Sequence, residues 1–154
     1  MPGTSTITAL LATVDDLLTE GPGDSPLSRA GRDRGAAYAL RIALEAAVDA
    51  ALTARETSLR EVSTRAKLLC LRHYAGPVLA HRVKALWSQL SAGCKYHHDE
   101  LGPTHAQVWA WRAAVGTLVT ELAAPRTIPE FPRQLGAERL PAEVTATAHD
   151  GEHT

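Results

Sequence analysis

The stretch CKYHHDELGPT, residues 94–104, places a thiol, two adjacent imidazoles and two carboxylates in front of a Gly-Pro break. Side chains of these types serve as metal ligands and as catalytic groups in proteins. Cys94 and His97 are three residues apart, so they share one face of a helix, and the same spacing recurs at Cys70 and His73. Together the two pairs would supply the Cys₂His₂ ligand set of a structural zinc site.

Distance argues against one ion held by both pairs. Gly76-Pro77 joins the two helices that carry them. In an antiparallel hairpin the second pair lies about 18 residues beyond that turn, or about 27 Å at 1.5 Å per residue. A single-ion site of shorter range could use four candidate ligands: Cys94, His97, His98 and His105. Because His97 and His98 point about 100° apart on a helix, we expect no metal and no cofactor.

A catalytic interpretation of the same stretch is weaker still. A Cys–His nucleophile needs an open cleft and an orienting group, whereas Cys94 and His97 fall on a predicted core stripe, where a thiol is inert. Asp99 and Glu100 diverge in direction and have no opposing acid. The sequence contains no Gly-rich phosphate loop, His-Glu-x-x-His or Gly-x-Ser-x-Gly motif. We therefore predict no catalytic residue, which favours a non-enzymatic protein and leaves enzymatic activity an open alternative.

Helical periodicity dominates the elements that would position these residues, and strand patterns are almost absent. The pattern predicts an all-α, antiparallel up-down bundle of about five helices, with breaks near residues 21–30, 56–58, 75–77 and 102–104. Capping boxes are predicted at Ser58/Glu61 and Thr104/Gln107. The expected core stripes are Ile7, Leu10, Leu11, Val14, Leu17 and Leu18; Leu40, Ala43, Leu44, Ala47, Val48, Ala51 and Leu52; Leu59, Val62, Ala66, Leu69 and His73; Leu79, Val83, Leu86, Leu90, Cys94, His97 and Leu101; and Val108, Trp111, Val115, Leu118 and Leu122.

Two regions are expected along the chain. Residues 1–124 form the helical bundle, and residues 125–154, with several prolines and few large apolar side chains, form an extended, partly disordered tail. Ile128 and Phe131 lie between prolines in this tail, and we expect them to pack on a hydrophobic surface of the bundle or of a partner.

Charge is unevenly distributed, although the formal net charge is only −1. Residues 55–95 contain eight Lys/Arg and two acids. These charges either line solvated helix faces or form a strip that binds an anionic partner. The candidate strip consists of Arg60, Lys67, Arg72, Arg82 and Lys84.

The composition points to a bacterial, cytoplasmic protein. No apolar run approaches the roughly 20 residues of a membrane span, and the N-terminus lacks the basic region and cleavage site of a signal peptide. We therefore expect no membrane contact, and two reduced cysteines. The Ala/Arg/Leu-rich composition is typical of a GC-rich bacterial gene.

Trp109 and Arg112 are candidates for partner binding. On a helix they form a row with His105 and Gly116, about 200° away from the core residue Trp111. This row either packs on another helix of the chain or faces a partner, because Trp and Arg are the residue types that anchor interfaces.

The order of elements, with YHHDELGPT at the end of the fourth helix followed by HAQVWAWRAAVGTLVTEL, resembles the HEPN family of small all-α domains and, more loosely, a set of small actinobacterial helical proteins. The resemblance covers about residues 5–123. It implies a homodimer that is either a metal-independent RNase of a toxin–antitoxin or defence system, or an inactive binding module. Active members share an Arg that is followed, after four to six intervening residues, by a His. No helical His here has an Arg at that spacing before it, so no catalytic residue carries over.

Three functions are consistent with these patterns. The first is a non-catalytic interaction module that forms a homo-oligomer or binds a partner protein. The second is a HEPN-like component that binds or processes RNA through the basic segment. The third is a metal-binding helical protein centred on Cys94 and His97.

Overall fold

The structure, a computed structural model, describes residues 2–21, 23, 24, 26–95 and 102–125. Within these ranges the chain is all-α, as predicted, and contains no strand. Its elements are α1 (Pro2–Thr19), α2 (Arg29–Thr53), the short 3₁₀ helix η1 (Thr57–Glu61), α3 (Thr64–Ala75), α4 (Pro77–Cys94) and α5 (His105–Ala123). No helix in the described ranges combines the length and apolar character needed to cross a membrane.

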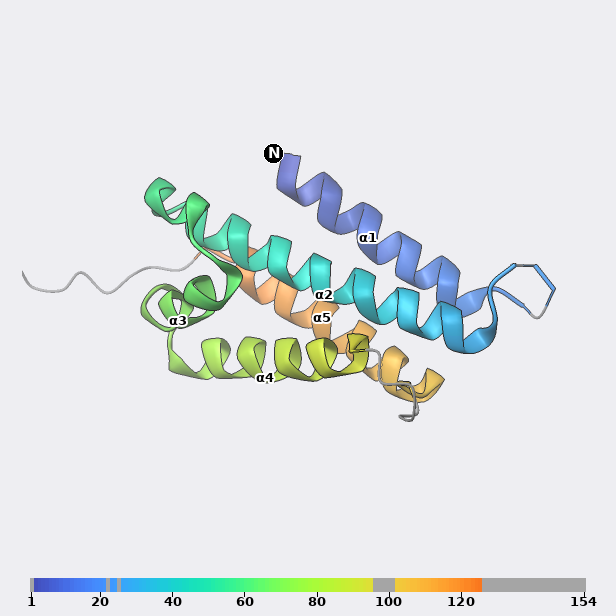
Figure 1. Cartoon of the computed structure of the whole chain (residues 1–154). Coiled ribbons are helices and arrows are strands. Elements are labelled where there is room, and N and C mark those ends of the chain that lie inside the picture. The colour runs from blue at the N-terminus through green and yellow to red at the C-terminus, as the bar shows by residue number, and fades with distance from the viewer. Residues whose placement is uncertain (1, 22, 25, 96–101, 126–154) are drawn as a thin grey trace, which may run out of the picture.

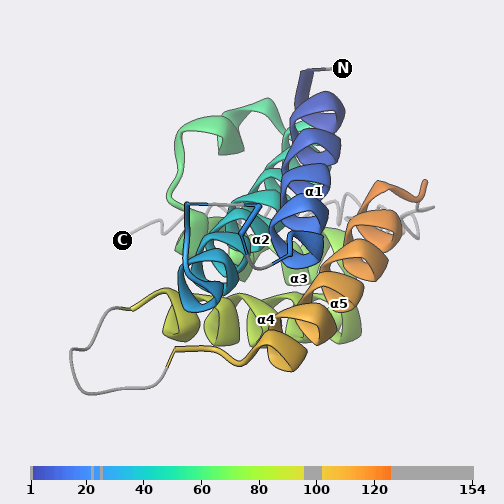
Figure 2. The same cartoon turned by 90° about the vertical axis from the view of Figure 1, so that its right-hand side faces the viewer.

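The long helix α2 lies at the centre of the described residues and packs on α1, α3, α4 and α5 (Figure 1). Figure 2 shows α1, α4 and α5 arranged around it. Alanines make this possible, because their small side chains let neighbouring helices approach closely. The buried alanines of α2 are Ala36, Ala37, Ala39, Ala43 and Ala47, and Leu40, Leu44 and Val48 are buried beside them.

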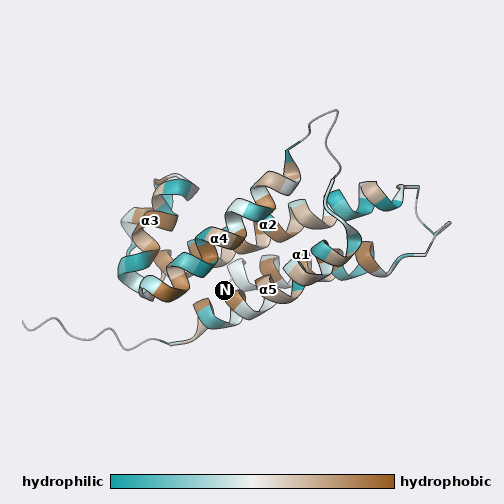
Figure 3. Ribbon diagram, turned by 90° about the horizontal axis from the view of Figure 1, so that it is seen from below, coloured by the Kyte–Doolittle hydropathy of each residue, from teal (hydrophilic) through white to brown (hydrophobic). Residues whose placement is uncertain are grey.

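The outer helices are amphipathic, and hydrophobic and hydrophilic residues alternate along their ribbons (Figure 3). In α5 the predicted stripe is buried in full. In α4 the first four members of the predicted stripe are buried, but the helix ends at Cys94. His97 and Leu101, the last members of that stripe, lie outside the described residues.

The predicted stripe of the third helix is wrong. Residues 57–61 form η1, and α3 begins only at Thr64, where Ser63 Oγ accepts a hydrogen bond from the backbone N–H of Ala66. The residues that α3 buries are Leu68, Leu71 and Ala75. Leu69 is 68% exposed, and His73 is also exposed.

A glycine turn joins α3 to α4, and an N-cap fixes the start of α5. Gly76 links α3 to α4 with a φ of +83°, a conformation that glycine adopts without strain, and Pro77 starts α4. The α5 helix begins after Thr104, whose hydroxyl accepts a hydrogen bond from the backbone N–H of Gln107 at 3.2 Å. This N-cap lies where the sequence predicts it and fixes the first turn of α5, which carries His105.

Candidate functional site

Three side chains at the start of α5 form a hydrogen-bonded chain that ends at the protein surface. Oδ1 of Asp33, on α2, lies 2.7 Å from Nδ1 of His105. One turn further along α5, the indole N–H of Trp109 donates to Nε2 of His105 at 3.0 Å. The two rings meet edge to face, with centroids 6.3 Å apart. The chain therefore connects a residue of the core helix to an aromatic side chain that faces solvent.

The hydrogen bonds define where the imidazole proton lies. An indole N–H can only donate, so Nε2 of His105 must act as the acceptor and carries no proton. The single proton of the neutral ring is then on Nδ1, from which it is donated to Asp33. Asp33 thus sets the tautomer and the ring orientation of His105, and His105 in turn sets the orientation of Trp109.

The exposed fraction increases along these three hydrogen-bonded residues, from the core to the surface. Asp33 is 4% exposed, the side chain of His105 is 28% exposed, and Trp109 is 41% exposed. Burying a carboxylate is costly unless it is hydrogen-bonded. The hydrogen bond to His105 satisfies Asp33, and it also fixes the imidazole to which the exposed Trp109 indole is bonded.

Arg112, the second candidate for partner binding, is used within the fold. Its Nε and Nη2 donate to the two carboxylate oxygens of Asp15, on α1, each at 2.7 Å. Gly116 leaves room for this guanidinium, because a Cβ there would lie 3.1 Å from Arg112 Nη1. The row predicted from sequence therefore divides into two parts. Arg112 links α5 to α1 through Asp15, while Trp109 is hydrogen-bonded to His105 of the same helix and faces solvent.

The basic segment maps to α3 and α4, and we use the name hairpin for these two consecutive helices joined at Gly76, without reference to their crossing angle. Residues 62–95 contain six Lys/Arg and no Asp or Glu, whereas the rest of the chain carries ten Lys/Arg against 17 acids. Two cations of the candidate strip are paired inside the molecule: Lys67 with Asp49 of α2, and Arg82 with Glu121 of α5. The side chains of Arg60, Arg72 and Lys84 are exposed and make no ion pair with any described residue.

Helical geometry places the exposed cations on the outer surface of this hairpin. Lys67 faces α2, and Arg65 lies about 200° from it around α3. Arg72 is two turns beyond Arg65 on the same face. Arg82 faces α5, and Lys84 lies about 200° from it around α4. The fold thus separates cations that tie the hairpin to the bundle from cations that point away from it.

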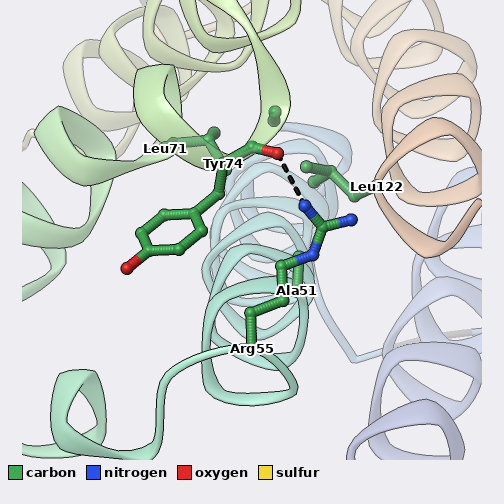
Figure 4. A pocket seen from close by; sticks show the side chains of 6 residues that line it. Ala51, Arg55, Leu71, Tyr74 and Leu122 are labelled. Carbon is green, nitrogen blue, oxygen red and sulfur yellow. Dashed lines mark hydrogen bonds between the residues drawn. The ribbon is translucent and has the colours of Figure 1, made fainter. Parts of the chain in front are cut away.

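A small hollow lies where α2, α3 and α5 meet (Figure 4). Its lining residues are Ala51, Arg55, Leu71, Tyr74, Ala75 and Leu122. Nη1 of Arg55 donates to the backbone carbonyl of Tyr74 at 2.7 Å (Figure 4). The hollow has a volume of about 10 Å³, enough for roughly one water molecule. It is far too small for an organic substrate.

Cys94 is half-buried at the end of α4, beside a polar cluster. Glu45 Oε1 accepts hydrogen bonds from Arg41 Nε at 3.0 Å and from Trp87 Nε1 at 2.8 Å. The guanidinium of Arg41 lies 5.7 Å from the centroid of the Trp87 ring. Burial raises the pKa of the Cys94 thiol, although the charge of Arg41 opposes the shift. The thiol is therefore kept protonated and poorly reactive.

The remaining site candidates fall in two groups. His97, His98, Ile128 and Phe131 lie outside the described residues. Among the described residues, no three His, Cys, Asp or Glu side chains gather in a way that could hold a metal ion. His105, the described histidine among the four ligand candidates, directs its Nε2 at the Trp109 indole.

Comparison with known proteins adds no assignment: no family model, curated protein or solved structure matches this chain. A function for the protein therefore has to be inferred from the geometry of its own residues.

Proposed function

We propose that this protein is a non-catalytic interaction module, an antiparallel up-down helical bundle that associates with a second copy of itself or joins a larger complex, with Trp109 as its anchor. The observation that carries the proposal is the Asp33–His105–Trp109 chain. Tryptophan is the residue type most enriched at the energetic centres of interfaces. An anchor that is oriented in advance loses less entropy on binding than a free side chain.

Binding fits this geometry better than catalysis. An Asp–His pair can serve as a general base when the free nitrogen of the imidazole faces a cleft. Here that nitrogen faces an indole at 3.0 Å, and the hollow at Arg55 lies among other residues, at the opposite end of α5. The chain of hydrogen bonds therefore presents an apolar aromatic surface rather than a reactive atom.

Sedimentation of the wild type over a wide concentration range tests the homo-oligomeric form of the proposal. We expect a reversible dimer, which Trp109→Ala weakens by at least about 1–2 kcal/mol. The matched control is Tyr38→Ala, which removes another exposed aromatic side chain, 57% exposed on α2, and should leave association unchanged. A wild type that stays monomeric at every concentration would contradict the dimer. Equal weakening by both variants would contradict the role of Trp109.

The acid-free hairpin favours a second candidate function, the binding of RNA by a HEPN-like module. Its exposed cations point away from the bundle, and phosphate contacts of this kind release counterions. The expected signature is an affinity for short single-stranded RNA that falls steeply as salt increases from about 50 to 200 mM.

Paired variants test this second candidate by fluorescence anisotropy. Arg72→Gln/Lys84→Gln removes two exposed cations of the hairpin, and we expect the slope of log affinity against log salt to become shallower by about 1.4, since each single-strand contact contributes about 0.7. Arg29→Gln/Arg34→Gln removes the same charge from α2 and serves as the control. Equal slopes for the two variants would reject the hairpin as the RNA-binding surface.

A further inference from the structure

Each of the three tryptophans donates its indole N–H to a different kind of acceptor. Trp87 donates to the Glu45 carboxylate at 2.8 Å, and Trp111 donates to the Gln89 side-chain carbonyl at 3.1 Å. Trp109 donates to the imidazole Nε2 of His105 at 3.0 Å. Of these three acceptors, the imidazole nitrogen is of the type that becomes protonated between pH 5 and 8, the range in which histidine changes charge. A protonated nitrogen can no longer accept a hydrogen bond.

Protonation of His105 has opposite effects on its two hydrogen bonds. The Nδ1–H continues to donate to the Asp33 carboxylate, and this hydrogen bond becomes stronger because both partners are now charged. Nε2 gains an N–H, so a donor then faces the donor of Trp109. The bond between Nε2 and the indole is lost, and water takes its place on both groups.

We propose that Asp33, His105 and Trp109 form a proton-operated latch. With His105 neutral, the indole is held against the imidazole and the latch is closed. When a proton from solvent binds Nε2, the indole is released while His105 stays attached to α2 through Asp33. Release needs no unfolding, because Trp109 is already 41% exposed and its backbone lies within α5.

The charged groups around the latch come from three helices. On α2, Asp33 is bonded to His105, and its neighbour Arg32 is also buried, with its Nη1 donating to the Leu27 carbonyl at 3.0 Å. Arg34, also on α2, lies close to Gly102, just before α5. A Cβ added to Gly102 would be 3.0 Å from Arg34 Nε. On α5 itself, Arg112 follows Trp109 and is bound to Asp15 of α1. Asp33 is thus the carboxylate that holds His105 in either protonation state.

The latch gives the proposed interaction a pH dependence, and this part of the inference rests on the function proposed above. A released indole must be immobilised again on binding. Immobilising one such side chain lowers affinity by a factor of roughly two to ten. Association through Trp109 should therefore weaken by about that factor as the pH falls from 8 to 5.

Indole N–H signals of the ¹⁵N-labelled full-length protein test the latch without any partner. Three signals are assigned with Trp→Phe variants and followed from pH 8 to pH 5, the range in which histidine titrates. We expect the Trp109 signal to shift and to exchange faster with water on acidification. The Trp111 signal is the internal control, because its amide acceptor does not titrate. In His105→Gln, which keeps a side chain without a titrating ring, the Trp109 signal should no longer respond.

Two results would overturn the latch: a Trp109 signal that is constant over this range, or one that shifts equally in His105→Gln. Circular dichroism over the same range checks that the helices stay folded. Sedimentation at both pH extremes separates the latch from the proposed function. If the Trp109 signal responds to pH but dimerisation does not, the latch exists and only its regulatory role is overturned. A protein that is monomeric at both extremes overturns the homodimer, while the indole signal still decides whether the latch exists.

Discussion

Gly93 on α4 provides the space in which the Trp111 indole lies. A Cβ at this position would stand 2.9 Å from Trp111 Cη2 and 3.1 Å from Cζ3. Trp111 is 6% exposed and bonded to Gln89, so it has little freedom to move away. We expect Gly93→Ala to lower the free energy of unfolding by about 1–3 kcal/mol, through overpacking. Urea denaturation followed by circular dichroism measures the change.

Gly35 on α2 is the matched control for this substitution. A Cβ there would make an ordinary contact of 3.5 Å with Leu17 Cδ1. Gly35→Ala should therefore stabilise the protein by about 0.5–1 kcal/mol, because alanine has the higher helix propensity. A Gly93→Ala protein as stable as Gly35→Ala would show that the Trp111 side chain relaxes freely.

The thiol of Cys94 should be slow to react. Burial raises its pKa, so less thiolate is present at a given pH than for an exposed cysteine. In a Cys70→Ser background we expect alkylation by iodoacetamide near pH 8 to be slower than that of a model thiol. The rate should keep rising with pH beyond the range in which the model thiol levels off, and full denaturation should remove the difference. Alkylation of the folded protein at the model rate would contradict this expectation.

The bidentate pair of Arg112 and Asp15 links α5 to α1. Their side chains are 24% and 44% exposed, so solvent screens the pair and its contribution is modest. We expect Arg112→Lys to cost about 0.5–1 kcal/mol, because an ammonium cannot reproduce the two parallel hydrogen bonds. A double-mutant cycle with Asp15→Asn measures the coupling. A coupling energy of zero would mean that the pair does not hold α1 in place.

Helix periodicity predicted four of the five buried faces, and the reason for its failure in α3 is local. The predicted stripe took every third or fourth residue from Leu59 to His73, as if these residues formed one continuous helix. A non-helical break at Val62–Ser63 resets the helical phase, so the count beyond it points to the wrong face. The predicted N-cap, Ser58, lies within η1, and Ser63 caps α3 instead.

Only part of the candidate site could be predicted from the sequence. The row of His105 and Trp109 follows from helical spacing within one element. Asp33 does not, because it lies 72 residues from His105 and their contact depends on how α2 packs against α5. The sequence does not single out Asp33, because α2 also contains the acids Glu45 and Asp49. Only the packing of the helices shows which of these carboxylates is buried.

The five helices share one continuous core, from Ile7 on α1 to Leu122 on α5. A single core of this kind unfolds as a unit. We expect thermal or urea unfolding to give coincident transitions for helix content and for tryptophan fluorescence, which reports on α4 and α5. An earlier loss of helix signal would instead show that some helices, such as α3, unfold separately.

The central position of α2 has a consequence for how the chain is made. Translation delivers α1 and α2 first, and these neighbours in sequence pack together along their length. The stripe of α5 that completes the burial of α2 is synthesised only after residue 104. Until then part of the alanine- and leucine-rich surface of α2 stays in water, so the nascent protein is most prone to aggregate, and most in need of a chaperone, just before α5 leaves the ribosome.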